Sequence, residues 1–332
     1  MKAIKVAMFS AKTYDQEFFA QYCSQHCQID YFESSLNEQT VSLATGYDTV
    51  CVFVNDDITV AVIKNLHELK VSHIALRCAG FNNVDIEAAK SYGIRVSRVP
   101  AYSPEAVAEH TLALMLALGR KLHKAYNRVK EANFSLTGLL GFTFHGKTAG
   151  IVGTGKIGSV LARILHGMGV KVLCFDPMPD NDLVSAGFEY CSFEQLIKQS
   201  DVISLHCPLN NDTQHLISKN TIDNMKHGVM LINTSRGGLV DTKAIIAGLK
   251  TGQIGHLGLD VYEMESELFF QDLSCEIVQD DVFQRLMTFP NVLITGHQGF
   301  FTQEALQEIA SSTMTSIEQA HSVSADNPSF IV

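Results

Sequence analysis

The segment Ala149-Gly150-Ile151-Val152-Gly153-Thr154-Gly155-Lys156-Ile157-Gly158 carries the strongest structural signal in this 332-residue chain. Its first four residues are small or apolar and predict a buried strand, and the amphipathic residues 160–168 predict a helix. In a strand, glycine turn and helix of this order, the first glycine permits the turn and the second admits a pyrophosphate to the backbone. The third lets the helix pack closely on the strand. The segment therefore predicts a dinucleotide-binding site, with the positive end of the helix towards the phosphates.

An acidic residue stands where such a site binds the ribose. Asp176 lies eighteen residues after Gly158, at the end of the apolar run 170–175 that predicts the next strand. A carboxylate at this position accepts hydrogen bonds from the adenosine ribose and repels a 2′-phosphate. We therefore expect NAD(H), rather than NADP(H), as the cofactor.

A second glycine-rich segment, Gly141-Phe142-Thr143-Phe144-His145-Gly146-Lys147-Thr148, matches the phosphate-binding P-loop pattern letter for letter. A P-loop follows a strand and opens a helix, whereas this segment contains two phenylalanines and precedes the predicted strand 149–152. Because the order of elements is wrong, we reject a P-loop here.

Short apolar runs alternate with amphipathic stretches along the chain, which is the pattern of parallel sheets with crossover helices. The predicted strands are 4–9, 28–32, 49–54, 73–76 and 94–97 in a first series, and 149–152, 170–175, 201–206, 229–233, 256–260 and 292–295 in a second. The sequence thus predicts an α/β protein with two parallel sheets in two domains.

Two further helices stand out. Ser103-Pro104-Glu105 has the composition of a helix N-terminus, and residues 112–118 make the helix that follows apolar almost all round. We expect this helix to be buried between the domains and against a second subunit, so that the protein is a homo-oligomer, dimeric or tetrameric. The helical stretch 302–320 is expected to pack back on the first domain.

Composition excludes several classes of protein. The chain has 46% hydrophobic and 18% charged residues and a net charge of −10, without a basic cluster, which argues against disorder and nucleic-acid binding. No apolar span approaches the roughly 20 residues of a membrane helix, and the N-terminus lacks the pattern of a signal peptide. Eight dispersed cysteines suit a reducing cytoplasm. Cys23, His26 and Cys27 lack a second pair of ligands, so no metal is expected.

An enzyme that reduces a carbonyl with a nicotinamide needs a proton donor, a group that orients it, and a cation for a substrate carboxylate. Such groups should follow the carboxyl ends of strands. Arg236 follows one predicted strand, and its planar fork suits a 2-oxo carboxylate. His297 follows another, and His206 is a rival for the same role. Glu263 and Glu265 are equal candidates for the carboxylate that orients the imidazole.

Several motifs together resemble the D-isomer-specific 2-hydroxyacid dehydrogenases, and within that family the bacterial fermentative D-lactate dehydrogenases. Besides the glycine turn they are Arg77-Cys78-Ala79-Gly80-Phe81-Asn82-Asn83-Val84-Asp85, Val99-Pro100-Ala101-Tyr102-Ser103-Pro104-Glu105-Ala106-Val107-Ala108-Glu109-His110, Asn233-Thr234-Ser235-Arg236-Gly237, Asp260-Val261-Tyr262-Glu263-Met264-Glu265 and Gly296-His297-Gln298. The resemblance implies that Arg236 binds the substrate, that His297 is the acid/base, and that Glu265 rather than Glu263 is its partner.

The activity implied by the resemblance is the NADH-dependent, reversible reduction of pyruvate to D-lactate. Reduction of another 2-oxo acid, such as 2-oxoisocaproate, hydroxypyruvate or glyoxylate, is the alternative. A second alternative, from another class, is an NAD-sensing regulator that resembles a corepressor.

The resemblance also implies contacts for substrate and cofactor. Ala79 and Gly80 would offer backbone amides to the substrate carboxylate, and Tyr102 and Phe300 would border a small substrate pocket. The implied cofactor contacts are Gly153, Gly155, Lys156, Ile157, Gly158, Asp176, His206, Cys207, Pro208, Thr213, Thr234, Ser235 and Asp260. One departure is Gly299, which stands where the family more often has alanine.

The implied fold consists of two doubly wound parallel-sheet domains. Residues 1–101 and 300–332 would form a flavodoxin-like substrate domain, and residues 102–299 a Rossmann NAD-binding domain. A cleft between them would close on the substrate and exclude water.

Overall fold

The computed structural model describes residues 3–322 and 329–332. The chain forms two compact units, the first made of Met1–Ser103 with Phe301–Val332 and the second of Pro104–Phe300. These divisions fall where helix α4 (Pro104–Gly119) begins and just before helix α12 (Gln303–Ala320). Tyr102 therefore lies in the first unit and Phe300 in the second, whereas the expected boundaries at 101/102 and 299/300 put each residue on the other side.

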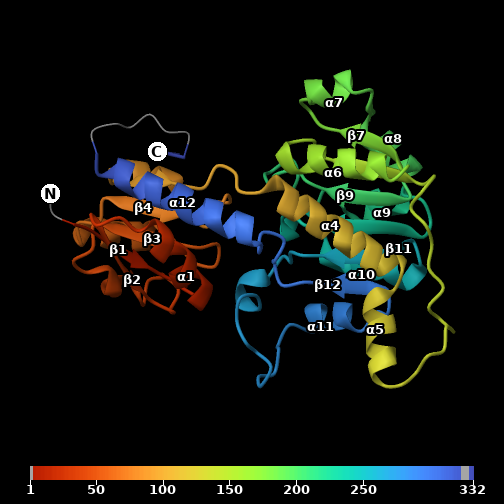
Figure 1. The fold of residues 1–332 in the computed structure, drawn as a ribbon, viewed down its shortest axis with the longest axis horizontal. Helices are drawn as coiled ribbons and strands as arrows, with labels where there is room; N and C mark the ends of the chain where they lie inside the picture. The colour runs from red at the N-terminus through yellow and green to blue at the C-terminus, as the bar shows by residue number, and fades with distance from the viewer. Residues whose placement is uncertain (1–2, 323–328) are drawn as a thin grey trace. The chain divides into compact units, whose positions relative to one another are not determined.

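The first unit is built on a five-stranded parallel sheet with the strand order β2-β1-β3-β4-β5 (Figure 1). Its strands are β1 (Ile4–Met8), β2 (Cys27–Tyr31), β3 (Thr49–Val52), β4 (His73–Leu76) and β5 (Arg95–Ser97). Its other helices are α1 (Thr13–Tyr22), the 3-10 turn η1 (Val41–Ala44), α2 (Val60–Glu68) and α3 (Ile86–Ser91). Every residue of β3 and β4 is buried, as expected for parallel strands covered on both faces. The strand order is that of flavodoxin-like doubly wound sheets, as predicted.

Helix α12 returns the chain to the first unit, as predicted. The hydroxyl of Thr302 caps its N-terminus by accepting a hydrogen bond from a first-turn backbone amide at 3.2 Å. Met314 and Ile317 of this helix pack in one apolar cluster with Val6 and Met8 of β1. The last helix of the chain thus covers the sheet that the first strand begins.

The second unit is built on a seven-stranded parallel sheet with the order β12-β11-β10-β9-β6-β7-β8. Its strands are β6 (Thr148–Val152), β7 (Lys171–Phe175), β8 (Glu189–Tyr190), β9 (Val202–Leu205), β10 (Val229–Asn233), β11 (Ile254–Leu259) and β12 (Val292–Ile294). Its other helical segments are α5 (Leu122–Lys130), α6 (Lys156–Gly167), α7 (Asn181–Ser185), α8 (Phe193–Gln199), α9 (Lys219–Asp223), η2 (Gly237–Leu239), α10 (Thr242–Thr251), η3 (Glu265–Glu267) and α11 (Asp281–Met287). This is the doubly wound order of dinucleotide-binding folds with one more strand, and the strand order reverses between β6 and β9. The sequence missed β8, because two residues carry no periodic pattern.

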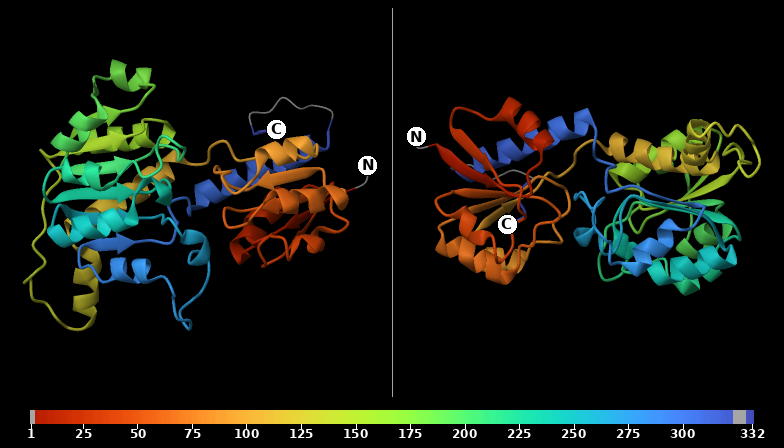
Figure 2. Two further views of the ribbon diagram at one scale, coloured as in Figure 1. Left: turned by 180° about the vertical axis from the view of Figure 1, so that it is seen from behind. Right: turned by 90° about the horizontal axis from the view of Figure 1, so that it is seen from below.

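Both faces of this sheet are apolar because successive strand residues point to opposite sides. Ile151 of β6 packs in a cluster with Met115 of α4 and Leu161 of α6. Its neighbour Val152 belongs to the cluster on the other face, with Ile245 of α10. Figure 2 shows the two helix layers, with α4 and α6 on one face and α10 and α11 on the other.

The apolar helix α4 is buried largely within the second unit itself. Leu114, Met115 and Leu118 lie in the core cluster beneath it, and Leu112 and Leu116 are partly buried beside them. Packing on α6, β10 and β11 explains most of its apolar surface. A second subunit is not needed to account for that surface.

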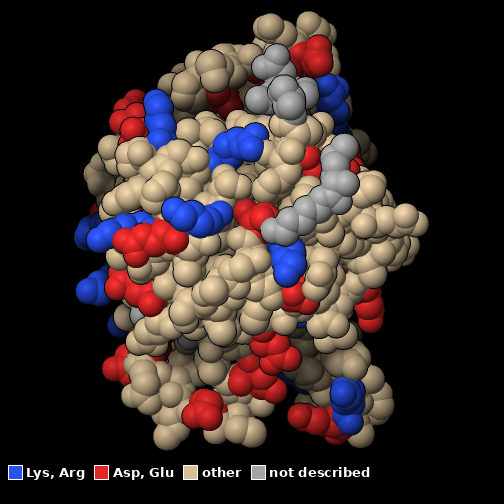
Figure 3. Space-filling model, turned by 90° about the vertical axis from the view of Figure 1, so that its left-hand side faces the viewer, with Lys and Arg blue, Asp and Glu red and all other residues tan. Residues whose placement is uncertain are grey.

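Charges of both signs are mixed on the face drawn in Figure 3, where lysines and arginines are separated by acidic and uncharged residues. Within residues 3–322 and 329–332, no helix has the length and apolar character needed to cross a membrane. The same residues contain no cluster of three His, Cys, Asp or Glu side chains arranged to hold a metal ion.

Candidate functional site

The glycine turn between β6 and α6 has the geometry of a phosphate cradle. Gly153 adopts φ +93°, and a Cβ there would lie 2.6 Å from the carbonyl carbon of His206. A Cβ on Gly158 would lie 2.0 Å from the carbonyl oxygen of Gly153. A Cβ on Gly155, in contrast, would meet no atom within 4 Å, so the backbone is open at this position. The first and third glycines are required by packing, and the second leaves room for a pyrophosphate beside the N-terminus of α6, which begins at Lys156 and Ile157.

Asp176 follows β7 and its carboxylate is fixed beside this turn. Its Oδ2 accepts hydrogen bonds from Thr154 N at 2.7 Å and from Thr154 Oγ1 at 3.3 Å. Its Oδ1 accepts one from Met178 N at 2.8 Å. The carboxylate is only partly buried and keeps lone pairs for further donors, which fits the proposed contact with a ribose.

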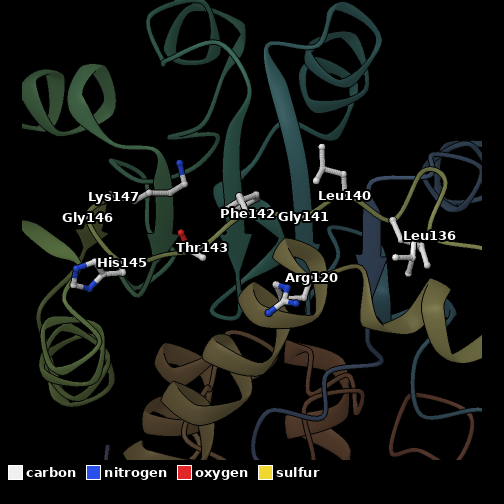
Figure 4. Close-up of a pocket in the computed structure, with 10 residues that line it drawn as sticks. Arg120, Leu136, Leu140, Gly141, Phe142, Thr143, His145, Gly146 and Lys147 are labelled. Atoms are coloured by element: carbon white, nitrogen blue, oxygen red, sulfur yellow. The ribbon is translucent and has the colours of Figure 1, made fainter.

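The P-loop-like segment lies at the wrong end of the same strand. Residues 141–147 precede β6, and Gly146 N donates a hydrogen bond to Gly169 O at 2.9 Å. Figure 4 shows these residues, except Phe144, lining an open pocket with Arg120, Leu136 and Leu140. The glycine turn lies at the other end of β6, roughly 15 Å away at the usual rise of a strand. This pocket is therefore separate from the predicted phosphate cradle.

His206 has the environment of a structural histidine. It follows β9, its Nε2 lies 2.8 Å from Ser204 Oγ, and burial lowers the pKa of the imidazole to about 4. Such a group is uncharged at neutral pH and its Nε2 faces a hydroxyl rather than a carboxylate, which makes it a poor proton donor. Its backbone, however, packs against Gly153 and so forms one wall of the cradle.

The remaining predicted cofactor residues after β9 and β10 lie in hydrogen-bonded turns. Thr213 Oγ1 donates to Pro208 O at 2.6 Å, and burial raises the pKa of the Cys207 thiol to about 11, which leaves it protonated. Thr234 Oγ1 lies 2.8 Å from Thr111 Oγ1 of α4, and Ser235 Oγ donates to Leu205 O at 2.9 Å. These contacts hold the loops at the carboxyl ends of β9 and β10.

His297 and Glu265 form a hydrogen-bonded pair. His297 Nδ1 lies 2.9 Å from Glu265 Oε1, and Glu265 Oε2 accepts a hydrogen bond from Tyr262 N at 2.9 Å. The His297 side chain is 15% exposed and that of Glu265 is 21% exposed. Since Glu265 occupies Nδ1, the other ring nitrogen, Nε2, is the atom that remains for a substrate. The rings of Phe270 and Phe300 lie 5.8 and 6.5 Å from the imidazole, centroid to centroid, and narrow the space beside it.

Glu263, the equal candidate from the sequence, points elsewhere. Its Oε1 lies 2.7 Å from His215 Nε2, and its Oε2 accepts hydrogen bonds from the backbone and side chain of Thr242 at the start of α10. The structure thus pairs His297 with Glu265 and leaves Glu263 to hold the N-terminus of a helix.

Arg236 is placed by the turn that follows β10. Asn233 Nδ2 donates to Arg236 O at 2.8 Å, and Arg236 Nη1 donates to Ser235 O at 2.7 Å. A Cβ on the next residue, Gly237, would lie 2.1 Å from the carbonyl carbon of Tyr262, so this turn packs closely on the segment that leads to Glu265. Strands β10, β11 and β12 are neighbours and parallel. Arg236, Glu265 and His297 therefore follow the carboxyl ends of three adjacent strands.

Asp260 was expected at the nicotinamide, and both of its oxygens are occupied by protein donors. Oδ1 accepts from Thr295 Oγ1 at 2.5 Å and Gln298 N at 2.9 Å, and Oδ2 accepts from Gly299 N at 2.8 Å. His110 Nε2 of α4 lies 3.2 Å from Oδ1. Burial alone would raise the pKa of Asp260, but the hydrogen bonds from His110 and Thr295 outweigh it and lower the pKa. Asp260 thus holds the turn that carries His297, a role that the sequence did not predict.

The predicted substrate loop lies in the first unit, after β4. Arg98 Nη1 donates to Ala79 O at 2.9 Å, and Cys78 Sγ donates to Gly80 O at 3.2 Å. The preceding residue, Arg77, is 2% exposed and bonds Asp15 Oδ1 through Nε at 3.2 Å. The loop is therefore anchored on both sides, and Tyr102 lies in the same unit.

The order of the second sheet, the glycine cradle with its carboxylate, and the histidine–glutamate pair define a nicotinamide-dependent oxidoreductase. A family model described as "D-isomer specific 2-hydroxyacid dehydrogenase, NAD binding domain" matches residues 112–299. The chain belongs to the D-isomer-specific 2-hydroxyacid dehydrogenase family and is an NAD-dependent enzyme, as the sequence predicted.

Relatives match over nearly the whole chain. The D-lactate dehydrogenase of Escherichia coli K12 is 50% identical over 95% of this chain and 96% of its own length. The 2-hydroxyacid dehydrogenase A of Aspergillus oryzae is 51% identical over 95% of this chain and 92% of its own. The apo structure of the Escherichia coli D-lactate dehydrogenase matches with a TM-score of 0.88 and 47% identity, covering 99% of this chain and 100% of that one. The Aquifex aeolicus D-lactate dehydrogenase complexed with NAD and lactic acid matches at a TM-score of 0.84 and 34% identity, covering 94% of each chain.

Proposed function

We propose that this protein catalyses the NADH-dependent, reversible reduction of pyruvate to D-lactate. The observation that carries the proposal is the 2.9 Å contact between His297 and Glu265, beside the strand end that bears Arg236. The D-lactate dehydrogenases among the relatives, which match at up to 50% identity over nearly the full chain, support pyruvate as the substrate.

In the proposed reaction, Arg236 binds the carboxylate of pyruvate through its planar guanidinium group. The backbone amides of Ala79 and Gly80, in the first unit, are the further proposed substrate contacts. The glycine turn and Asp176 would hold NADH, whose nicotinamide would supply a hydride to the carbonyl carbon. Protonated His297 gives its Nε2 proton to the carbonyl oxygen, which completes the hydroxyl group of lactate.

Glu265 has two tasks in this scheme. Its Oε1 keeps the Nδ1 proton of His297 in place, so that Nε2 is the nitrogen that gives or takes the substrate proton. Its negative charge stabilises the protonated, positively charged imidazole, which gives up its Nε2 proton in the reduction. In the oxidation of D-lactate, the neutral His297 accepts the hydroxyl proton by the reverse path.

Another 2-oxo acid is the second candidate substrate, and one comparison favours it. A D-2-hydroxyisocaproate dehydrogenase matches this chain with a TM-score of 0.78 and 32% identity, which is weaker on both measures than the match to the Escherichia coli D-lactate dehydrogenase. Phe270 and Phe300 beside His297 favour a small side chain on the substrate. The NAD-sensing regulator is disfavoured because Arg236, Glu265 and His297 are all present.

The test is a comparison of kcat/KM for NADH oxidation with pyruvate, 2-oxobutyrate, 2-oxoisocaproate, hydroxypyruvate and glyoxylate. The proposal predicts the highest value for pyruvate. One methylene group changes the ratio of kcat/KM between two substrates by about 10- to 200-fold. The order of the substrates therefore reports the size of the pocket. A higher value for another acid would replace pyruvate as the substrate, and no turnover with any of them would contradict the proposed reaction.

We also propose a homo-oligomer formed by the apolar arm, defined as residues 122–140. Helix α5 within it has no buried residue, and Leu122, Tyr126 and Val129 are 55%, 64% and 55% exposed at helical spacing. Phe134, Leu136 and Leu140 in the same arm are 73%, 81% and 88% exposed. So many exposed large apolar side chains in one short segment are unusual for a monomer, and we assign them to contacts with a second copy of this chain. Light scattering after size exclusion should show a dimer or tetramer that dissociates in Leu136→Glu, and a wild-type monomer would overturn this.

A reducing cytoplasm is the proposed compartment. All eight cysteines are free thiols, and Cys51 and Cys174 are buried in the two cores. The protein's fold therefore needs no oxidising environment.

A further inference from the structure

The carboxylate of Asp176 lies at the end of a chain of hydrogen bonds that begins on strand β8. Asp180 N donates to the phenolic oxygen of Tyr190 at 3.0 Å. Tyr190 OH donates to Thr154 Oγ1 at 2.8 Å, and Thr154 Oγ1 donates to Asp176 Oδ2 at 3.3 Å. Three side chains thus connect the glycine turn, the end of β7 and β8.

The direction of this chain follows from the number of protons available. The amide of Asp180 can only donate, so the oxygen of Tyr190 accepts from it and directs its own proton to Thr154. Thr154 also has one hydroxyl proton, and because its oxygen accepts from Tyr190, that proton is directed to Asp176. Burial raises the pKa of Tyr190, which keeps the phenol protonated and able to donate.

The residues of this hydrogen-bond chain lie in well-packed parts of the fold. Thr154 is 2% exposed and is the residue between the first two glycines of the cradle. Tyr190 is half-buried and pairs with Cys174 of β7 in the sheet register. The backbone of Thr154 also bonds Asp176 directly, at 2.7 Å. Rotation of the Asp176 carboxylate would therefore break several contacts at once.

We propose that Tyr190 is a positioning residue for cofactor choice, which acts through Thr154 to hold the Asp176 carboxylate where it binds the ribose hydroxyls of NAD(H) and repels the 2′-phosphate of NADP(H). The inference rests on the proposed role of Asp176 at the ribose. Discrimination by repulsion requires a charge that cannot move away from the phosphate. Without the Tyr190 hydroxyl, the Thr154 hydroxyl is free to turn and the carboxylate loses a fixed donor.

The experiment measures the dissociation constants of NADH and NADPH by calorimetric titration, without substrate, for wild type, Tyr190→Phe, Thr154→Val and Asp176→Ala. The ratio of the NADPH constant to the NADH constant should fall about threefold to tenfold in Tyr190→Phe, the value of one hydrogen bond. It should fall at least as far in Thr154→Val and furthest in Asp176→Ala.

Two controls separate positioning from a general loss of structure. Tyr47 OH also donates to a carboxylate, Asp30 Oδ2, at 2.8 Å in the first unit, so Tyr47→Phe removes the same group away from the cradle and should leave the ratio unchanged. In the Asp176→Ala background, Tyr190→Phe should have no further effect on the ratio, because Tyr190 acts only through that carboxylate.

The outcomes distinguish the inference from the assignment on which it rests. A changed ratio in Asp176→Ala with an unchanged ratio in Tyr190→Phe would overturn the role of Tyr190 alone. An unchanged ratio in Asp176→Ala would overturn the role of Asp176 itself. An equal effect of Tyr190→Phe with and without Asp176 would show that the tyrosine acts by another route. Thr154→Ser, which keeps the hydroxyl, should restore the wild-type ratio that Thr154→Val loses.

Discussion

His297 Nδ1 lies 2.9 Å from Glu265 Oε1, and the same glutamate is fixed by the backbone amide of Tyr262. The chain contains a second pair of the same kind, His215 with Glu263 at 2.7 Å, in which the histidine is 43% exposed. The two pairs share their chemistry and differ in location, which makes the second a natural control for the first.

Replacement of His297 by alanine should lower kcat by about 10²- to 10⁴-fold, because a positioned acid/base contributes that much. The dissociation constant of NADH should stay within about twofold, since no cradle residue changes. Steady-state kinetics measure the change in kcat, and calorimetric titration measures the dissociation constant of NADH. His215→Ala is the matched variant and should keep kcat near that of wild type. Near-normal turnover in His297→Ala would remove this residue from the mechanism.

Glu265→Gln should lower kcat about tenfold or more, because the amide has nearly the same shape as the carboxylate but no charge to stabilise the imidazolium during proton transfer. Glu263→Gln should keep kcat near that of wild type, because Glu263 contacts His215 and Thr242 instead. Steady-state kinetics with pyruvate and NADH make the comparison. If both variants keep the wild-type kcat, Glu265 has only a structural role.

Asp260→Asn should disturb the turn that carries His297. An amide nitrogen would replace one of the oxygens that accept from Gln298 N and Gly299 N, so two donors would face each other. The pKa of Asp260 is lowered in the folded protein, so its ionised form stabilises the fold above the unfolded pKa of about 3.9. That contribution to stability is lost as the pH falls through the pKa that Asp260 has in the folded protein.

We therefore expect kcat of Asp260→Asn to fall more than tenfold at neutral pH, and the acid-induced loss of stability below pH 4 to be smaller than in wild type. Urea unfolding at pH 3.5 and pH 7 measures the second effect. A variant with wild-type kcat would show that the turn holds His297 without this carboxylate.

Two buried histidines should make the stability depend on pH above pH 4. Burial lowers the pKa of His206 to about 4 and that of His73 to about 3. Because these values lie below the unfolded value of about 6.5, the unfolded chain binds more protons, and stability falls as the pH drops from 6.5. At pH 5 each of these histidines should lower the free energy of unfolding by about 2 kcal/mol relative to its value at pH 7.5.

Replacement of His73 by phenylalanine should remove its share of this pH dependence, as measured by urea unfolding at the two pH values. His227, which is exposed, provides the control, and His227→Gln should keep the full wild-type dependence. An identical pH dependence in His73→Phe and wild type would mean that the buried imidazole is charged when folded.

The glycines of the site should differ sharply in their tolerance of alanine. A Cβ on Gly299 would lie 3.0 Å from Asp260 Oδ2, a distance that a small shift of the side chain relieves. Gly299→Ala should therefore keep kcat/KM within about threefold. A Cβ on Gly158 would lie 2.0 Å from a carbonyl oxygen of the backbone, which cannot shift so easily, and Gly158→Ala should lose NADH binding at least 100-fold. Similar behaviour of the two variants in a titration with NADH would contradict this account of the cradle.

The sequence predicted those parts of the site that depend on local patterns. The glycine turn, Asp176 at the end of the next strand, and the positions of Arg236 and His297 after strands all follow from periodicity and spacing. Glu263 and Glu265 could not be separated in this way, because both follow the same strand two residues apart. Their different partners come from packing on α10 and on the turn around His297.

Contacts between distant residues had no signal in the sequence. Thr295 and His110 are 185 positions apart, and only the folded sheet brings both to Asp260. The hydrogen bonds that connect Tyr190 through Thr154 to Asp176 were missed for a related reason. Strand β8 is only two residues long and has no periodicity in the sequence. Burial of His206, which weakens it as a rival acid, likewise depends on its tertiary surroundings.

The most direct test of the proposed reaction is to combine pyruvate with NADH and to analyse the chirality of the product, in wild type and in His297→Ala. The proposed mechanism predicts D-lactate formed in equal amount to the NADH consumed, and a rate at least 100-fold lower in the variant. Formation of L-lactate, no lactate at all, or an undiminished rate without the imidazole would contradict it.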